Sequence, residues 1–179
     1  MNVVSIMAHQ DDELMCLGTM LKMKNLGHNL AFICLTDGAA GMTHMPDMPF
    51  EEAAKIRAVE MKNLTSDINA EYICLNRPDE YLYDTADLRL ELIEAIRFVS
   101  ADVIFTHNTV DYNVDHMTAC LLVRQCAMQA ALPIQKTNRS TVLHFADNMC
   151  LAISFLGYGI YSEYERRGDL CTRNLAEQR

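Results

Sequence analysis

Short apolar segments alternate along this chain with segments whose apolar residues recur at helical spacing. Strands that alternate with helices of ~10–15 residues form βαβ units, and these build a mostly parallel sheet with helices on both faces. The expected strands cover residues 3–8, 30–35, 72–75, 103–106 and 141–145. The expected helices cover residues 14–25, 50–65, 88–99 and 116–131. We therefore expect an α/β fold, and 179 residues are enough for one domain with its own core.

The topology also predicts where chemistry should lie. In open parallel sheets, ligands bind beyond the carboxyl ends of the strands. This rule points to the residues that follow Ala8, Leu35 and Thr106. A loop rich in Gly, Met and Pro, residues 39–49, comes after the second of these strands. A loop of that length is typically either functional, for example a lid, or disordered, and both interpretations stay open.

Charge and composition exclude several classes of partner. A net charge of −9 argues against non-specific binding to nucleic acid and, more weakly, to an anionic membrane. No stretch reaches the ~18 apolar residues that a membrane span needs, and no signal peptide is visible. The seven cysteines are odd in number and include no C-x-x-C pair, so we expect them to be reduced and largely buried. Together these features predict a cytoplasmic protein.

The loop after the first strand, AHQDDE at residues 8–13, holds one imidazole and three carboxylates. His9 and Asp12 are three residues apart, so a turn that enters a helix can direct both side chains at one ion. Imidazole nitrogen with carboxylate oxygen suits zinc and other borderline divalent metals. The simpler interpretation is that Asp11 and Asp12 cap the following helix, where carboxylates stabilise the N-terminus.

A second polar segment, FTHNTVDYNVDHMTA, follows the fourth strand. His116 opens the next helix and could complete a three-ligand site, which leaves the open position that a catalytic zinc requires. Asp111 or Asp115 could orient a ligand through a hydrogen bond. We interpret His107, at the exit of the strand, as a structural hydrogen-bonding residue.

Together the two segments resemble the signature of the zinc-dependent N-deacetylases of the PIG-L/LmbE-like superfamily. AHQDDE is similar to that family's A-H-P-D-D-E, and FTHNTVDYNVDHMTA is similar to its second motif, whose core is H-x-D-H. The T-D-G turn at residues 36–38 and the pair Arg57 and Glu60 also look similar. The resemblance covers roughly residues 3–146.

The resemblance implies a Rossmann-like fold and removal of an acetyl group from a small N-acetylated amino sugar or sugar conjugate. It implies three metal ligands, which are His9, Asp12 and His116. The implied ion is zinc, although the same donors also accept Fe²⁺. The remaining implied roles are the general base at Asp11, a substrate contact at Arg57 and support of the second motif by Asp115.

Two departures from the family pattern bear on activity. Gln10 replaces a proline, which costs loop rigidity but removes no chemical group. Asn113 stands where the family has the first histidine of H-x-D-H, a residue that stabilises the oxyanion and helps to manage the leaving group's proton. Asparagine donates a hydrogen bond but carries no proton. Two hypotheses therefore stay open: an N-deacetylase that uses Asp11 and Asn113 in catalysis, and a diverged metal-binding homologue that binds a ligand or a partner chain.

The carboxyl end does not resemble the family. Residues 147–159 are apolar with two glycines, and residues 161–179 are strongly polar. We expect a single deacetylase domain over residues 1–179 whose C-terminus is shortened or diverged. The apolar stretch 151–161 would suit a contact between copies of the chain in a homo-oligomer.

Overall fold

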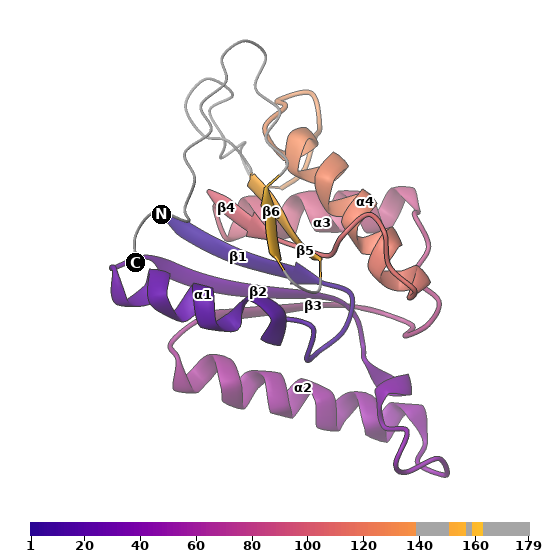
Figure 1. Cartoon of the computed structure of the whole chain (residues 1–179). Coiled ribbons are helices and arrows are strands. Elements are labelled where there is room, and N and C mark those ends of the chain that lie inside the picture. The colour runs from indigo at the N-terminus through magenta and orange to yellow at the C-terminus, as the bar shows by residue number, and fades with distance from the viewer. Residues whose placement is uncertain (139–150, 157–158, 163–179) are drawn as a thin grey trace.

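The structure is a computed structural model that describes residues 1–138, 151–156 and 159–162. Its strands form one six-stranded sheet in the order β3-β2-β1-β4-β5-β6 (Figure 1). The strands are β1 (Asn2–Met7), β2 (Asn29–Thr36), β3 (Glu71–Arg77), β4 (Val103–Phe105), β5 (Leu151–Leu156) and β6 (Gly159–Ser162). All neighbouring strands are parallel except β5 and β6, which are antiparallel.

Two layers of helices enclose the sheet. The helices are α1 (Leu14–Asn25), α2 (Phe50–Asp67), α3 (Ala86–Phe98) and α4 (Val114–Ala130), with a short 3-10 helix η1 (Ala39–Gly41). Helices α1 and α2 cover one face of the sheet, and α3 and α4 cover the other (Figure 1). The expected fold class, a mostly parallel α/β sheet with helices on both faces, is therefore confirmed.

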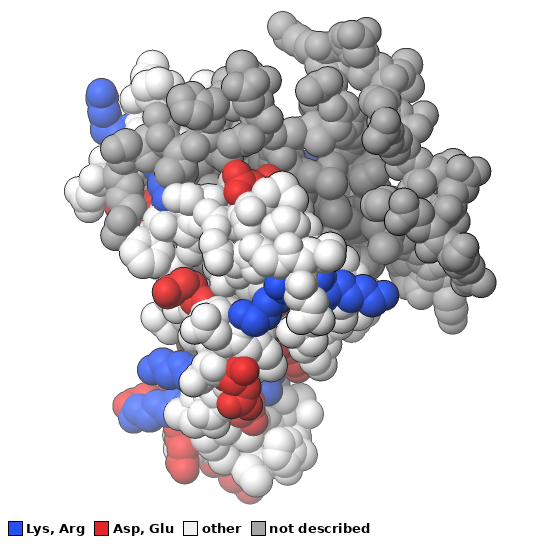
Figure 2. Space-filling view, turned by 90° about the vertical axis from the view of Figure 1, so that its left-hand side faces the viewer, with Lys and Arg blue, Asp and Glu red and all other residues white. Residues whose placement is uncertain are grey.

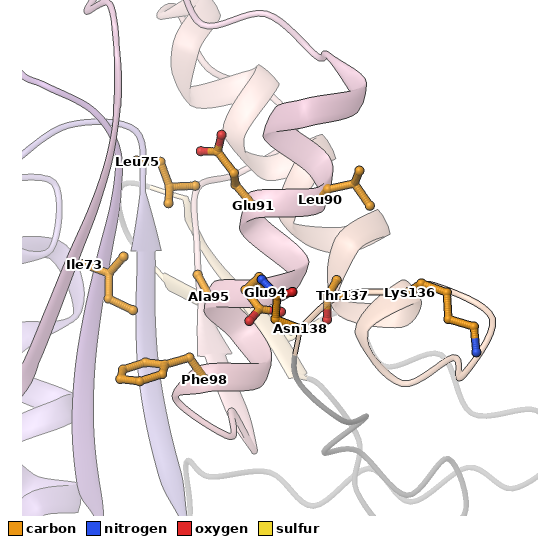
Figure 3. A pocket seen from close by; sticks show the side chains of 10 residues that line it. All are labelled: Ile73, Leu75, Leu90, Glu91, Glu94, Ala95, Phe98, Lys136, Thr137 and Asn138. Carbon is orange, nitrogen blue, oxygen red and sulfur yellow. The ribbon is translucent and has the colours of Figure 1, made fainter.

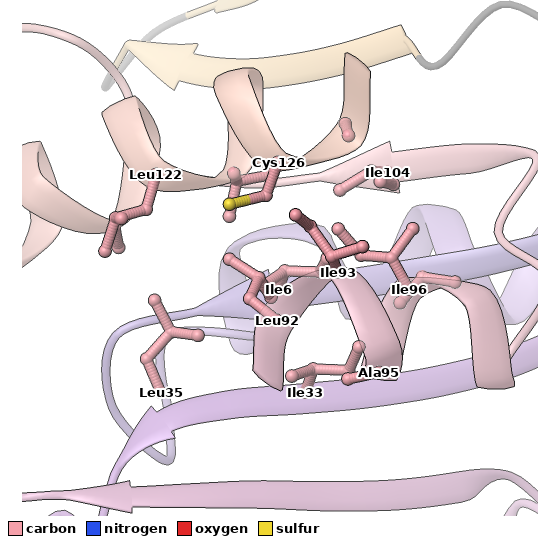
Figure 4. Packing of buried hydrophobic residues seen from close by; sticks show 14 of the residues in the cluster. Ile6, Ile33, Leu35, Leu92, Ile93, Ala95, Ile96, Ile104, Leu122 and Cys126 are labelled. Carbon is pink, nitrogen blue, oxygen red and sulfur yellow. The ribbon is translucent and has the colours of Figure 1, made fainter. Parts of the chain in front are cut away.

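Alternate residues of the central strands supply a separate core to each face. Ile6 and Ile33 pack with Leu92 of α3 in the core beneath α3 and α4 (Figure 4). Met7 belongs to the opposite core, together with Met20 of α1. Burial on both faces explains why these strands are continuous apolar runs.

Within the described residues, the expected strands and helices are present, with ends that shift by a few positions. Helix α4 begins two residues earlier than expected, because the side chain of Asn113 caps it. The loop 39–49 forms η1 and two tight turns, at Met45 and Met48. The expected strand at 141–145 and the residues from 163 onward lie outside the described residues.

The cysteines of the described segments are free thiols. Cys16, Cys34, Cys120 and Cys126 are buried, and Cys74 is partly buried. Burial raises the pKa of the Cys16 and Cys126 thiols to about 11. These five therefore behave as small core residues, as expected.

On the face shown in Figure 2, the described Lys and Arg side chains lie among Asp and Glu side chains on a mostly uncharged surface. Among the residues that the structure describes, no helix is both long enough and apolar enough to span a membrane.

Candidate metal centre and active site

The carboxyl ends of β1 to β4 carry a cluster of imidazoles and carboxylates. Because these strands are neighbours and parallel, the segments that follow them meet at one edge of the sheet. The loop after β1 contributes residues 9–12, the turn after β3 contributes Asp79, and the segment after β4 contributes residues 107–116. The predicted positions after Ala8 and Thr106 contribute to this cluster, whereas the segment after Leu35 supplies none of its side chains.

Three side chains converge in this cluster. His9, Asp12 and His116 each offer one ligand atom, and these atoms lie within 4.8 Å of one another. Asp12 Oδ2 is 3.2 Å from His9 Nδ1, and Asp12 Oδ1 is 3.3 Å from His116 Nε2. The simpler interpretation of Asp11 and Asp12 as helix caps is wrong, because no side-chain hydrogen bond caps α1.

Other carboxylates hold the second nitrogen of each ring. His9 Nε2 lies 3.0 Å from Asp79 Oδ1 and 3.3 Å from Asp115 Oδ2, and His116 Nδ1 lies 3.1 Å from Asp111 Oδ2. An imidazole that donates one N–H to a carboxylate keeps its other nitrogen for a metal. The nitrogens so reserved are His9 Nδ1 and His116 Nε2, and both face the same carboxylate. Two imidazoles and one carboxylate in this arrangement fit a zinc ion or a similar divalent cation.

The proximity of these groups shifts their pKa values. Burial disfavours the imidazolium of His9, but Asp12 and Asp79 outweigh burial and raise the pKa of His9 to about 10. Burial favours the neutral form of Asp12, yet the hydrogen-bonded imidazoles hold its pKa well below the usual range. Burial also opposes the charge of His116, but Asp12 and Asp111 raise its pKa. A divalent cation would take over the role that imidazole protons play opposite Asp12.

His107 lies in the cluster and offers one ligand atom of a second candidate group, which it forms with Asp111 and His116. Its Nε2 accepts a hydrogen bond from the backbone N–H of Ala8 at 2.9 Å, which ties β1 to the exit of β4. Its ring stacks on that of His116, with centroids 4.1 Å apart. Burial lowers the pKa of His107. These contacts agree with the structural role expected for this histidine.

Asp11 occupies a strained turn beside the candidate ligands. Its φ angle is 94°, a region that residues other than glycine rarely adopt. The Asp11 N–H donates to Glu13 Oε2 at 2.9 Å, so the buried Glu13 carboxylate holds this turn. The Asp11 side chain is 66% exposed, and its Oδ2 lies 3.1 Å from Arg57 Nη2. Partial burial raises the pKa of Asp11, and Arg57 opposes this shift.

The guanidinium of Arg57 contacts the turn that contains Asp11. Besides Asp11, its guanidinium contacts the backbone carbonyl oxygen of Gln10 and lies 2.7 Å from Glu60 Oε2. The structure therefore makes Arg57 a support for the Asp11 loop. The expected contact between Arg57 and a substrate stays a prediction.

Asn113 caps α4. Its Oδ1 accepts hydrogen bonds from the backbone N–H groups of Asp115, at 2.8 Å, and His116, at 3.4 Å. This cap fixes the orientation of the amide, so the group that faces away from the helix is the NH₂ donor. Asn113 thus sets the start of the helix that carries His116.

Asp79 is a site residue that the sequence analysis missed. It is buried, its Oδ1 approaches His9, and its Oδ2 accepts from the backbone N–H of Ala40 at 2.8 Å. A usable signal exists, because Asp79 follows a strand just as His9 and His107 do. Applying the carboxyl-end rule to the third strand would have identified it.

The side chain of Gln10 stabilises the loop after β1. The sequence analysis expected only a loss of rigidity from the replacement of proline at this position. Its side chain is buried, and its Nε2 donates to the carbonyl oxygen of Thr36 at 3.2 Å. The amide therefore anchors the loop after β1 to the end of β2. It also fills the space above Gly38, whose φ angle is 67°.

Gly38→Ala should destabilise the protein by about 1–3 kcal/mol, because an alanine at positive φ is strained and its Cβ would overlap the Gln10 amide. Gly18→Ala is the matched control, since Gly18 lies in α1 and a Cβ there meets nothing within 4 Å. That change should stabilise the protein by about 0.5–1 kcal/mol. Urea unfolding measures both. Equal stability of the two variants would contradict the packing described for Gln10.

A cavity of about 710 Å³, shown in Figure 3, is lined by a different set of residues. It lies against α3 and the edge strand β3, and it is lined by Ile73, Leu75, Leu90, Glu91, Glu94, Ala95, Phe98, Lys136, Thr137 and Asn138. None of the predicted site residues borders it. We therefore assign the candidate active site to the cluster of His and Asp side chains and not to this cavity.

The fold and the cluster define an α/β protein with a candidate metal centre at the carboxyl edge of its sheet. The PIG-L family model, described as GlcNAc-PI de-N-acetylase, matches residues 4–127. The chain belongs to this family, which confirms the resemblance seen in the sequence.

Solved structures with the same fold include deacetylases and a hydratase. N,N'-diacetylchitobiose deacetylase from Pyrococcus horikoshii is 21% identical, with a TM-score of 0.75 over 86% of this chain and 59% of that chain. GalB, the 4-carboxy-2-hydroxymuconate hydratase from Pseudomonas putida, is 19% identical, with a TM-score of 0.74 over 85% of this chain and 65% of that chain. The conserved protein TT1542 from Thermus thermophilus is 27% identical, with a TM-score of 0.65 over 78% of this chain and 61% of that chain.

The chain thus spans less than two thirds of the length of each of these three proteins. No curated protein matches it. The comparisons establish the family and the fold, and the substrate is a separate question.

Proposed function

We propose that this protein is a metal-dependent hydrolase that removes an acetyl group from an N-acetylated amino sugar or sugar conjugate. The observation that carries the proposal is the convergence of His9, Asp12 and His116 beside Asp11. Membership of a family whose model is a de-N-acetylase supports the reaction. The fold shared with a diacetylchitobiose deacetylase supports a sugar substrate.

In this proposal, His9, Asp12 and His116 hold the metal, and zinc is the ion that their donor set favours. The ion would supply Lewis-acid chemistry, since it polarises a carbonyl oxygen and acidifies water. Asp111 and Asp115 keep the two imidazoles in the orientation that binds it. Asp79 shares this task at His9.

The proposed base is Asp11. Its carboxylate accepts a proton from water as the water oxygen attacks the acetyl carbonyl carbon. It then returns the proton to the amide nitrogen as the C–N bond breaks, so the products are acetate and a free amine. Arg57 keeps the Asp11 carboxylate in place through their ion pair. The raised pKa of Asp11 suits a group that must both accept and donate a proton.

Asn113 is proposed to donate from its amide NH₂ to the oxyanion that forms on the acetyl oxygen. Its Oδ1 is engaged by α4, so only the donor is presented. This role replaces part of what the family's histidine does, without its proton.

Variants of Asn113 separate the working hydrolase from a diverged binder. Asn113→Ser keeps a side-chain oxygen for the cap but loses the amide donor, so we expect near-native stability and a fall in acetate release of about a hundredfold. Asn113→His loses the cap, at a cost of about 1 kcal/mol, yet should raise acetate release because it restores the family's acid–base group. Release is measured from N-acetylglucosamine-type substrates.

Two outcomes would count against this account. Unchanged release in Asn113→Ser would remove the proposed oxyanion donor. A chain that binds metal but releases no acetate, either as wild type or as Asn113→His, would favour the diverged binder.

A further inference from the structure

Three methionines recur at every third position in the loop between η1 and α2 (Figure 1). They are Met42, Met45 and Met48. Met45 is 47% exposed, and the other two are partly buried. Neither hydrophobic core of the described residues includes them, whereas Met20, for example, packs in the core beneath α1. Core packing therefore does not account for these three thioether side chains.

Two consecutive turns bring the three methionines close together. The N–H of Met45 donates to the carbonyl oxygen of Met42 at 2.9 Å, and the N–H of Met48 donates to the carbonyl oxygen of Met45 at 3.0 Å. In a turn of this kind, the Cα atoms of the first and fourth residues lie within about 7 Å of one another. Pro46 occupies the second position of the second turn, where the fixed φ angle of proline favours the turn. The sequence thus sets the spacing of the three side chains.

Both ends of the loop are fixed to ordered parts of the protein. The N–H of Ala40 in η1 donates to Asp79 Oδ2 at 2.8 Å. At the other end, the carbonyl oxygen of Pro49 accepts from the N–H of Ala53 at 3.1 Å, within the first turn of α2. A loop that is held in place before a ligand binds loses less conformational entropy when the ligand arrives.

The loop offers a set of soft donor atoms. Thioether sulfur binds soft monovalent ions such as Cu⁺, and the flexible methionine side chain lets the sulfur reach a shared ion. His44 lies between the first two methionines and is exposed. Within the described residues, no hydrogen bond or ion pair engages its ring, so its imidazole can add a nitrogen donor. The carboxylate of Asp47, in the second turn, adds a negative charge that attracts a cation.

This donor set differs from that of the candidate metal centre. His9, Asp12 and His116 offer nitrogen and oxygen atoms, which suit zinc, and they share no residue with the loop. Cysteine competes for soft ions as the thiolate. Burial raises the pKa of Cys126 to about 11, so this thiol stays protonated and is a poor competitor.

We propose that Met42, Met45 and Met48, together with His44, form a binding site for a soft monovalent cation, Cu⁺. Three thioether sulfurs and one imidazole nitrogen supply its donors. The site is separate from the candidate zinc centre and does not depend on the proposed function.

The test is an NMR titration of protein with isotope-labelled methionine methyl groups. The probe is Ag⁺, which has the ligand preference of Cu⁺ and is not oxidised in air. The methyl signals of Met42, Met45 and Met48 should shift together, because one ion contacts all three sulfurs. The signal of Met128, which is 52% exposed on α4, should not change. Each signal is assigned from its absence in the matching leucine variant.

Met45→Leu removes one sulfur at nearly constant side-chain volume, so the loop should keep its fold. The Ag⁺ concentration that half-shifts the Met42 and Met48 signals should rise at least about tenfold in this variant. His44→Ala should also raise it. Met128→Leu is the matched control and should leave it unchanged.

Methionine signals that stay in place while Ag⁺ binds the protein would overturn the proposal, because the ion would then be held by cysteine. A shift of the Met45 signal alone would also overturn it, since no shared site would exist. The same holds if Met45→Leu and Met128→Leu gave equal titration curves.

Discussion

His116→Ala is expected to abolish stoichiometric metal binding, with an affinity loss of more than about a hundredfold. The variant removes one of the three candidate ligands and leaves Asp12 Oδ1 without its imidazole partner. Loss of a supporting residue alone typically costs about 10–100-fold, so loss of a direct ligand should cost more. Metal analysis of the purified protein by mass spectrometry measures the effect.

The matched control for this variant is His28→Ala. His28 precedes β2 at the opposite end of the sheet, so its removal should leave one metal per chain. If His116→Ala retained stoichiometric metal, the assignment of the centre would be wrong. If both variants lost metal equally, the loss would reflect the protein as a whole.

Asp11→Asn should lower acetate release by about 10²–10⁴-fold and leave the metal content unchanged. Asparagine cannot accept the proton, but it tolerates the φ angle of 94° better than most residues and can still contact Arg57. The folded turn is therefore preserved and the chemistry is tested by itself. Acetate release and metal content are measured on the same preparations.

Full turnover by Asp11→Asn would exclude Asp11 as the base. Loss of metal together with turnover would instead mean that Asp11 supports the ligand set. The variant can separate catalysis from metal binding because neither oxygen of Asp11 is among the three candidate ligand atoms.

The parallel sheet could be predicted because strands buried on both faces are continuous apolar runs, separated by segments of helical period. The meeting of His9, Asp12 and His116 also follows from topology, since β1 and β4 are adjacent and both precede polar segments. The ends of elements are less predictable. Asn113 caps α4 through backbone N–H groups, and a capping contact has no hydrophobic period to reveal it.

The neighbours of the site are harder to predict than its centre. Asp79 reaches His9 from β3, a strand two positions away in the sheet, and no local spacing links these residues. Arg57 contacts the Asp11 loop, and the sequence analysis did not predict that contact. Such contacts depend on how loops from separate strands meet in space.

The most direct test of the central claim is acetate release from an N-acetylated glucosamine disaccharide by metal-stripped protein as zinc is added back. The account predicts that release is absent without metal, rises with added zinc and saturates near one equivalent per chain. Binding of one equivalent of zinc without any acetate release would contradict it.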